Sequence, residues 1–115
     1  MVFRRLDPAR LRQLRGRILQ LLYLAAMSEA GNPEDPYTVS RGVLVGTLEH
    51  ASELPSNEDL RGALRVLEEK SAVRVTWRHD GSGDFVSLRL LSLGIDLVEG
   101  VASDPSISFT RRREA

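Results

Sequence analysis

Arginine side chains are the groups in this sequence best suited to bind a ligand. Fifteen of the 16 basic residues are arginine, with Lys70 the exception. The planar guanidinium can donate two parallel hydrogen bonds to a phosphate or to the edge of guanine. GC-rich coding produces the same bias, so composition alone does not identify the ligand.

Charge is unevenly distributed along the chain, although the formal net charge is zero. Residues 1–20 carry six arginines against Asp7 (+5), residues 21–110 carry seven basic and 14 acidic groups (−7), and residues 111–115 add +2. A positive field must therefore come from the termini and from local patches. The six crowded arginines before residue 20 are a better candidate for binding phosphate than Arg111–Arg113, which a solvated tail also explains.

The other reactive residues favour no enzymatic reaction. The 115 residues include two histidines and no cysteine, which excludes disulfides, thiolate metal sites and redox function. No catalytic triad, paired-carboxylate cleft or glycine-rich phosphate loop has credible spacing. His50 and Glu53 lie three residues apart, but two ligands do not make a metal site. We therefore expect neither an enzyme nor a metal or other cofactor.

Membrane-directing signals are also lacking. The first residues contain no apolar run followed by small residues, which a secretory signal requires. The longest apolar run, Leu21–Met27, is far shorter than the roughly 20 residues that span a bilayer. Together with the absence of cysteine, this predicts a cytoplasmic protein with no membrane partner.

The first element expected is a long helix from about Pro8 to about Ser28. Asp7 is placed to cap it, and proline suits the first helical position. Leu21–Met27 is apolar on all sides, and one small domain rarely covers such a segment completely. Two interpretations stay open, a fully enclosed central helix and a homodimer. The candidate dimer-interface residues are Leu21, Leu22, Leu24 and Met27.

A second, shorter helix is expected after a loop over residues 31–36 and a short strand at Tyr37–Val39. Ser40 is placed to cap this helix. Its apolar residues repeat at helical spacing and predict one buried stripe. The stripe consists of Leu44, Leu48 and Ala51.

Leu54-Pro55 breaks the chain before a third helix. Ser56 and Asp59 have the spacing of a capping box, with aspartate in place of the usual glutamate. At 100° per residue, the side chains that follow divide into two faces. The buried stripe is Leu60, Ala63, Leu64 and Leu67, and the outward face is Glu58, Arg61, Gly62, Arg65 and Glu69.

A hairpin and a short last helix complete the pattern. Apolar and polar residues alternate on both sides of the turn around Asp80-Gly81, a strong hairpin signal. The inward residues are Val73, Val75 and Trp77 on one strand and Val86, Leu88 and Leu90 on the other. Ser92 is placed to cap a helix over 93–99, which Gly100 ends. The fold class predicted is mainly α with a small antiparallel β-sheet (α+β), with one domain over 1–100 and a C-terminal tail over 101–115.

Two stretches resemble known proteins. Leu60–Val75 (LRGALRVLEEKSAVRV) is similar to the recognition helix and first wing strand of bacterial winged helix-turn-helix regulators of the ArsR and MarR type. Ser92–Gly100, with Asp104-Pro105 behind it, resembles the closing segment of small winged-helix proteins encoded in Mu-like prophages. The resemblance covers roughly Tyr37 to Pro105. It implies a three-helix core, a β-hairpin wing and a short C-terminal helix.

The function implied by this resemblance is that of a DNA-binding transcriptional regulator. The third helix would enter the major groove of double-stranded DNA, the wing would meet the backbone, and a homodimer would read two half-sites. Carried over by position, the base-reading residues are Asn57, Arg61 and Arg65, and the backbone contacts are Arg41, Ser56, Arg78 and His79.

Some residues depart from that pattern and keep a second interpretation open. Acidic side chains lie on or beside the DNA-facing surface: Glu58, Asp59, Glu69, Asp80 and Asp84. ArsR-type metal sensors use cysteine ligands, and this chain has none. The outward face could simply be solvated, with Glu58 paired to Arg61 and Arg65 to Glu69. The alternative function is a winged-helix module that binds protein and not DNA.

Overall fold

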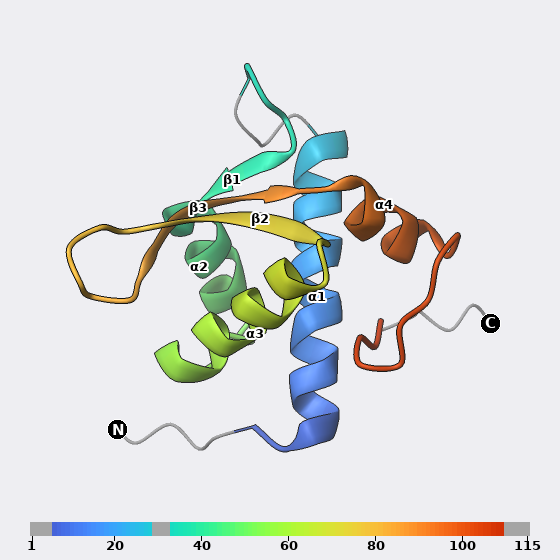
Figure 1. The fold of residues 1–115 in the computed structure, drawn as a ribbon, viewed down its shortest axis with the longest axis horizontal. Helices are drawn as coiled ribbons and strands as arrows, with labels where there is room; N and C mark the ends of the chain where they lie inside the picture. The colour runs from blue at the N-terminus through green and yellow to red at the C-terminus, as the bar shows by residue number, and fades with distance from the viewer. Residues whose placement is uncertain (1–5, 29–32, 110–115) are drawn as a thin grey trace.

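The computed structural model describes residues 6–28 and 33–109. Within them the chain forms four helices and one three-stranded antiparallel sheet (Figure 1). This confirms the predicted α+β class. The elements in order are α1 (Pro8–Met27), β1 (Thr38–Ser40), α2 (Arg41–His50), α3 (Asn57–Glu69), β2 (Val73–Trp77), β3 (Phe85–Leu90) and α4 (Ser92–Glu99).

Three predicted helix caps are confirmed. The Asp7 side chain accepts a hydrogen bond from the Arg10 N–H at 2.9 Å, Ser40 from Val43 at 3.3 Å, and Ser56 from Asp59 at 3.2 Å. Each bond satisfies a backbone donor that the first helical turn leaves without a partner. The residues just before α2 and α3 therefore fix where these helices begin: Ser40, the last residue of β1, and Ser56 in the preceding loop.

The fourth cap was predicted wrongly, at Ser92. This residue is the first residue of α4, and Leu91 occupies the cap position without a side-chain hydrogen bond. The Leu91 N–H instead donates to the Ala72 carbonyl at 3.0 Å, so β3 runs directly into the helix. The predicted end is confirmed, because Gly100 adopts the left-handed conformation with φ of 80°.

The sheet has the strand order β1-β3-β2, and both neighbours of β3 are antiparallel to it. A bulge shifts the register, so that Thr76 pairs with Ser87 but Trp77 pairs with Phe85. The extra residue reverses the inward and outward alternation at the start of β3. Val86 was predicted to face inward, but it is 47% exposed, while Phe85 is fully buried.

The hydrophobic core lies where α1, α3 and the sheet meet (Figure 1). The predicted stripe of α3 is confirmed in full, and that of α2 in part. Leu44 and Leu48 are buried, but Ala51 is exposed because α2 ends at His50. The largest buried side chains include Ile18, Leu19 and Leu22 of α1, Leu64 and Leu67 of α3, and Phe85, Leu88 and Leu90 of β3.

The chain after α4 does not leave the domain where the predicted tail begins. Residues 101–109, called the C-terminal segment from here on, fold back along α1 (Figure 1). Ile107 is only 6% exposed and belongs to the core, and the Ser108 N–H donates to the Arg12 carbonyl at 3.0 Å. The apolar residues of this segment, Val101, Ala102, Ile107 and Phe109, follow neither a helical nor an alternating pattern, so the sequence did not predict this packing. The rest of the predicted tail, with Arg111–Arg113, lies outside the described residues.

Candidate nucleic-acid interface

The turn between β2 and β3, residues 78–84, has its own internal hydrogen bonds. Asp80 accepts from the Ser82 N–H at 3.0 Å, and the Arg78 N–H donates to the Asp84 carbonyl at 2.9 Å. Gly81 and Gly83 both have positive φ, which other residues rarely adopt. Bonds from Ser82 lower the pKa of Asp80, so that its charge at neutral pH is secure. The hairpin turn therefore has a defined shape before any partner arrives.

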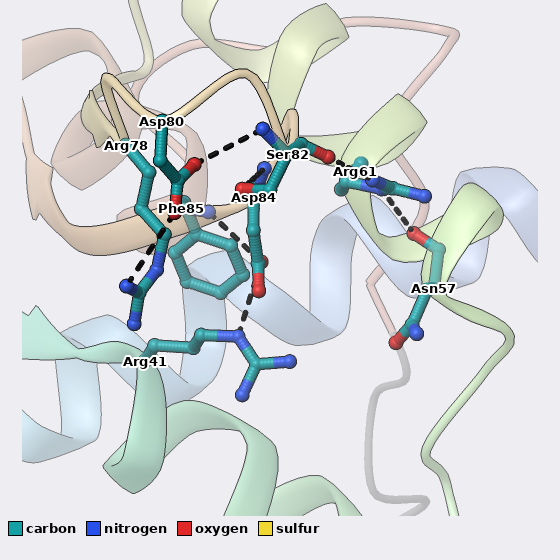
Figure 2. Close-up of polar contacts among 8 residues, drawn as sticks. All are labelled: Arg41, Asn57, Arg61, Arg78, Asp80, Ser82, Asp84 and Phe85. Carbon is teal, nitrogen blue, oxygen red and sulfur yellow. Dashed lines mark hydrogen bonds and ion pairs between the residues drawn. The ribbon is translucent and has the colours of Figure 1, made fainter.

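Arg61 joins the outward face of α3 to this hairpin turn (Figure 2). Its Nη1 donates to the Ser82 carbonyl at 3.2 Å, and its Nε donates to the Asn57 carbonyl at 3.3 Å. A Cβ built on Gly83 would lie 3.4 Å from Arg61 Nη1 and 3.9 Å from Arg65 Nη2. The structure thus brings two predicted base-reading arginines beside the hairpin turn.

Arg65 is held by an aromatic ring. Its guanidinium carbon lies 5.4 Å from the centre of the Trp77 ring, in a cation–π contact. Trp77 is in turn fixed from α3, because its Nε1 donates to Glu68 Oε1 at 3.1 Å. The other oxygen of Glu68 accepts from the Val75 N–H at 3.0 Å. Arg65 remains exposed, so it combines a fixed position with access to solvent.

The ion pairs of the alternative interpretation do not form. Among the described residues, there is no salt bridge between Glu58 and Arg61 or between Arg65 and Glu69. Both arginines turn toward the hairpin instead. Sequence patterns did not reveal the role of Glu68, whose acceptor contacts reach strand residues seven and nine positions later. The sequence offered one signal: Glu68 is next to the buried stripe, and a partly buried carboxylate needs hydrogen-bond donors.

Arg41 meets the hairpin turn from the start of α2. Its Nε lies 3.1 Å from Asp84 Oδ1, and its guanidinium lies over the Phe85 ring (Figure 2). Burial raises the pKa of Asp84, but hydrogen bonds from the Phe85 N–H and from Arg41 outweigh this and lower it below the usual value. Asp84 is therefore ionised at neutral pH and neutralises part of the Arg41 charge.

The remaining predicted backbone contacts lie around the same surface. Arg78 and His79 are exposed on the hairpin turn. The Nη1 atom of Arg78 lies 4.0 Å from Oδ2 of Asp80. The Ser56 hydroxyl accepts the capping bond of α3, so it is already used as an acceptor. Asp59, predicted to add negative charge to this face, is only 3% exposed and accepts from the Leu6 N–H at 3.0 Å. Its carboxylate thus faces the start of α1 and not the surface.

The predicted dimer-interface residues divide into two groups. Leu22 is fully buried in the core of its own chain, where it also lines the apolar groove described below, so its place in a dimer interface stays a prediction. Leu24 and Met27 are each 56% exposed. Beside them, an apolar groove of about 270 Å³ separates α1 from α2. Its lining includes Leu21, Leu24, Val39, Val43 and Leu44.

The arginines of α1 are only partly committed to internal contacts. Arg17 Nε lies 3.1 Å from Glu53 Oε1, and Arg15 donates to the Ser106 carbonyl at 2.9 Å. Arg10 is exposed on the first turn of the helix. Arg4 and Arg5 lie outside the described residues.

No family model, curated protein or solved structure matches this chain. Of the helices in the described part, none combines the length and apolar character needed to cross a bilayer. Within the same residues, no three His, Cys, Asp or Glu side chains are grouped as metal ligands would be. The surface formed by α2, α3 and the hairpin turn brings together Arg41, Arg61 and Arg65, three of the predicted DNA-contacting residues.

Proposed function

We propose that this chain is a winged-helix DNA-binding protein that regulates transcription, with a prophage origin suggested by its closing segment. The helix-turn-helix would be α2 and α3, and the wing would be the β2–β3 hairpin. The proposal is supported by the chain order α2, α3, β2, β3, in which an antiparallel hairpin follows the pair of helices, and by the pairing of β3 with β1, the strand before α2. In the proposed complex, α3 lies in the major groove and the wing touches the backbone.

The observation that carries this proposal is the bond from Arg61 to Ser82. It joins the exposed face of α3 to the hairpin turn, so that one surface presents Arg61, Arg65 and the wing together. Either arginine could offer a guanidinium fork to the O6 and N7 atoms of guanine. Because Trp77 restrains Arg65 before binding, less conformational entropy is lost when a base is contacted.

The test is a salt series on duplex DNA, after selection of a preferred sequence from a random duplex pool. Binding through phosphates must weaken steeply as salt rises, because counterions are released. We expect Arg65→Ala to lose roughly 1 to 3 kcal/mol of discrimination between the selected and a scrambled duplex. The matched control is Arg74→Ala, an exposed arginine on β2, which should keep the preference. No detectable affinity for any duplex at low salt would refute the proposal.

We further propose that the protein binds its operator as a homodimer, through Leu24, Met27 and the apolar groove between α1 and α2. Leu24 lines this groove, and Met27, three residues further along α1, is equally exposed, so a two-fold axis could bring the apolar surfaces of two chains together. Light scattering at micromolar concentration should give twice the mass of one chain. Leu24→Glu should halve that mass. Val101→Glu, at a 75% exposed residue that does not line the groove, should not change it.

A second candidate function is a winged-helix module that binds a protein partner. It is favoured by the internal contacts of Arg41, Arg61 and Arg65, which leave these charges partly satisfied without DNA. The same salt series separates the two functions, since a protein-binding module would show no affinity for any duplex even at low salt.

A further inference from the structure

A small crevice lies between the start of α2, the first turn of α3 and the hairpin turn. Its volume is about 110 Å³, and it is lined by Arg41, Asn57, Leu60, Arg61, Ser82, Asp84 and Phe85. Liquid water occupies about 30 Å³ per molecule, so the crevice has room for a group of several heavy atoms. Two guanidinium groups and one carboxylate line it, a balance of one positive charge.

The Asp84 carboxylate occupies the part of the crevice next to Arg41, where an anion from outside would have to bind. Its Oδ1 accepts from Arg41 Nε at 3.1 Å and from the Phe85 N–H at 2.8 Å. Figure 2 shows the Asp84 side chain extending from the hairpin turn toward the Arg41 guanidinium. Both partners of the ion pair are about one-third exposed, at 35% and 31%, so an incoming anion can reach them.

We propose that this crevice binds one phosphodiester phosphate of the DNA backbone, and that Asp84 is an internal anion that this phosphate displaces from Arg41. The inference rests on the proposed DNA-binding function and adds to it a residue, Asp84, that lowers the affinity for DNA. A phosphate and a carboxylate are both anionic acceptors for a guanidinium, so they compete for Arg41. A phosphate in the crevice would also be repelled by the Asp84 charge.

Asp84 thus has two opposing effects, because it orders the crevice before DNA binds and weakens the binding of phosphate. Before binding, Asp84 keeps Arg41 against Phe85 and so orders the start of α2 relative to the hairpin turn. During binding, the same carboxylate weakens the attraction between the crevice and a phosphate. Asp84 therefore lowers affinity for all duplexes alike, because phosphates carry no sequence information.

The experiment compares Asp84→Asn with Asp80→Asn. The amide oxygen of asparagine can still accept from Phe85 and Arg41, so the first variant removes charge and keeps the geometry. The second removes the same charge from the same turn, at a residue that does not line the crevice. The contact of Asp80 with Arg78 is weak, because the two charged groups lie 4.0 Å apart and both side chains are more than half exposed. We expect D84N to bind duplex DNA about 3- to 10-fold more tightly than wild type, equally for selected and scrambled sequences. The affinity of D80N should differ from that of wild type by less than about 2-fold. The salt dependence of D84N should be steeper by about one phosphate contact.

A titration with inorganic phosphate, followed by the NMR signals of the arginine Nε–Hε groups, gives a readout without DNA. The Arg41 signal should shift at lower phosphate concentration in D84N than in wild type. If wild type binds duplex but D84N gains no more affinity than D80N, the inference is overturned. If no variant binds any duplex, the proposed function fails and the phosphate titration decides: a larger Arg41 shift in D84N supports an anion site, and no shift overturns it.

Discussion

The hairpin turn and the C-terminal segment are both irregular stretches laid over a helix, but they are held by different forces. The C-terminal segment makes polar contacts with Arg15 and Lys70, but it is also anchored in the core by an apolar residue, Ile107. The hairpin turn reaches α2 and α3 through Arg41, Arg61 and a glycine, and its tip buries no apolar side chain. Moving the first must open the core, whereas moving the second breaks only polar contacts that water can replace.

This difference suits the two stretches to different tasks. A segment packed into the core stabilises the domain and transmits any displacement to it. A turn held by partly exposed arginines can adjust its position against a curved, charged partner at little cost in folding free energy. The structure therefore places its adaptable contacts on the surface proposed to meet DNA.

The largest expected effect comes from Gly16, where the C-terminal segment crosses α1. A Cβ at this position would lie 1.8 Å from the Ser108 carbonyl oxygen, so the backbone itself must move. We expect Gly16→Ala to lower the free energy of unfolding by roughly 1 to 3 kcal/mol, as overpacking does. In Gly46→Ala on α2 the new methyl meets nothing within 4 Å, and the variant should gain up to about 1 kcal/mol in helix propensity. Urea denaturation measures both, and a stable G16A would show that the segment is not held there.

The ion pair of Asp104 with Lys70 gives a smaller, pH-dependent effect. Hydrogen bonds from Lys70 and Ser106 lower the pKa of Asp104 to about 2 from its usual 3.8. The stabilisation is complete above about pH 5 and is lost as the pH falls through 3.8 toward 2. The shift alone corresponds to about 2 kcal/mol, but the pair is partly exposed, so we expect Asp104→Asn to cost about 1 kcal/mol at pH 7.

The measurement is the difference in unfolding free energy between D104N and wild type as a function of pH. Most of the difference should be lost by pH 2, where about half of the wild-type carboxyl groups are protonated, and the rest should be lost below that pH. Glu49→Gln, at an exposed residue of α2, should show no such dependence. A difference that is constant from pH 7 to pH 2 would contradict the assignment to this ion pair.

The smallest effect on stability is expected for Arg61→Ala. Loss of the bonds to Ser82 and Asn57 should change the free energy of unfolding by no more than about 0.5 kcal/mol, since both acceptors become accessible to water. The backbone NMR order parameters of residues 79–83 should nevertheless fall, while Arg74→Ala leaves them unchanged. Unaltered order in R61A would mean that the hairpin turn does not depend on α3.

Local signals in the sequence were sufficient for most of the fold. Asp7, Ser40 and Ser56 cap their helices by bonds to residues three positions away, so short-range patterns predict them. The outward position of Val86 follows from a bulge, which depends on pairing between two strands and leaves no trace in the alternation of one. The packing of Ile107 is likewise a contact between distant parts of the chain.

The candidate site shows the same division. The face of α3 that carries Arg61 and Arg65 follows from helical periodicity. The partners of these arginines do not, because Ser82 and Trp77 reach α3 only after the hairpin folds over it. The burial of Leu22 is a similar case, since an apolar run cannot reveal which of its side chains the chain's own core will cover.

Helix α3 is fastened by two of its own carboxylates, one near each end. Asp59 accepts from the backbone before α1, and Glu68 accepts from two donors on β2. Both anchors lie off the outward face, so the side chains at positions 58, 61, 65 and 69 can be exchanged without altering how the helix is mounted. For protein engineering, new recognition residues can therefore be introduced on the outward face of α3, while the contacts of Asp59 and Glu68 preserve the orientation of the helix.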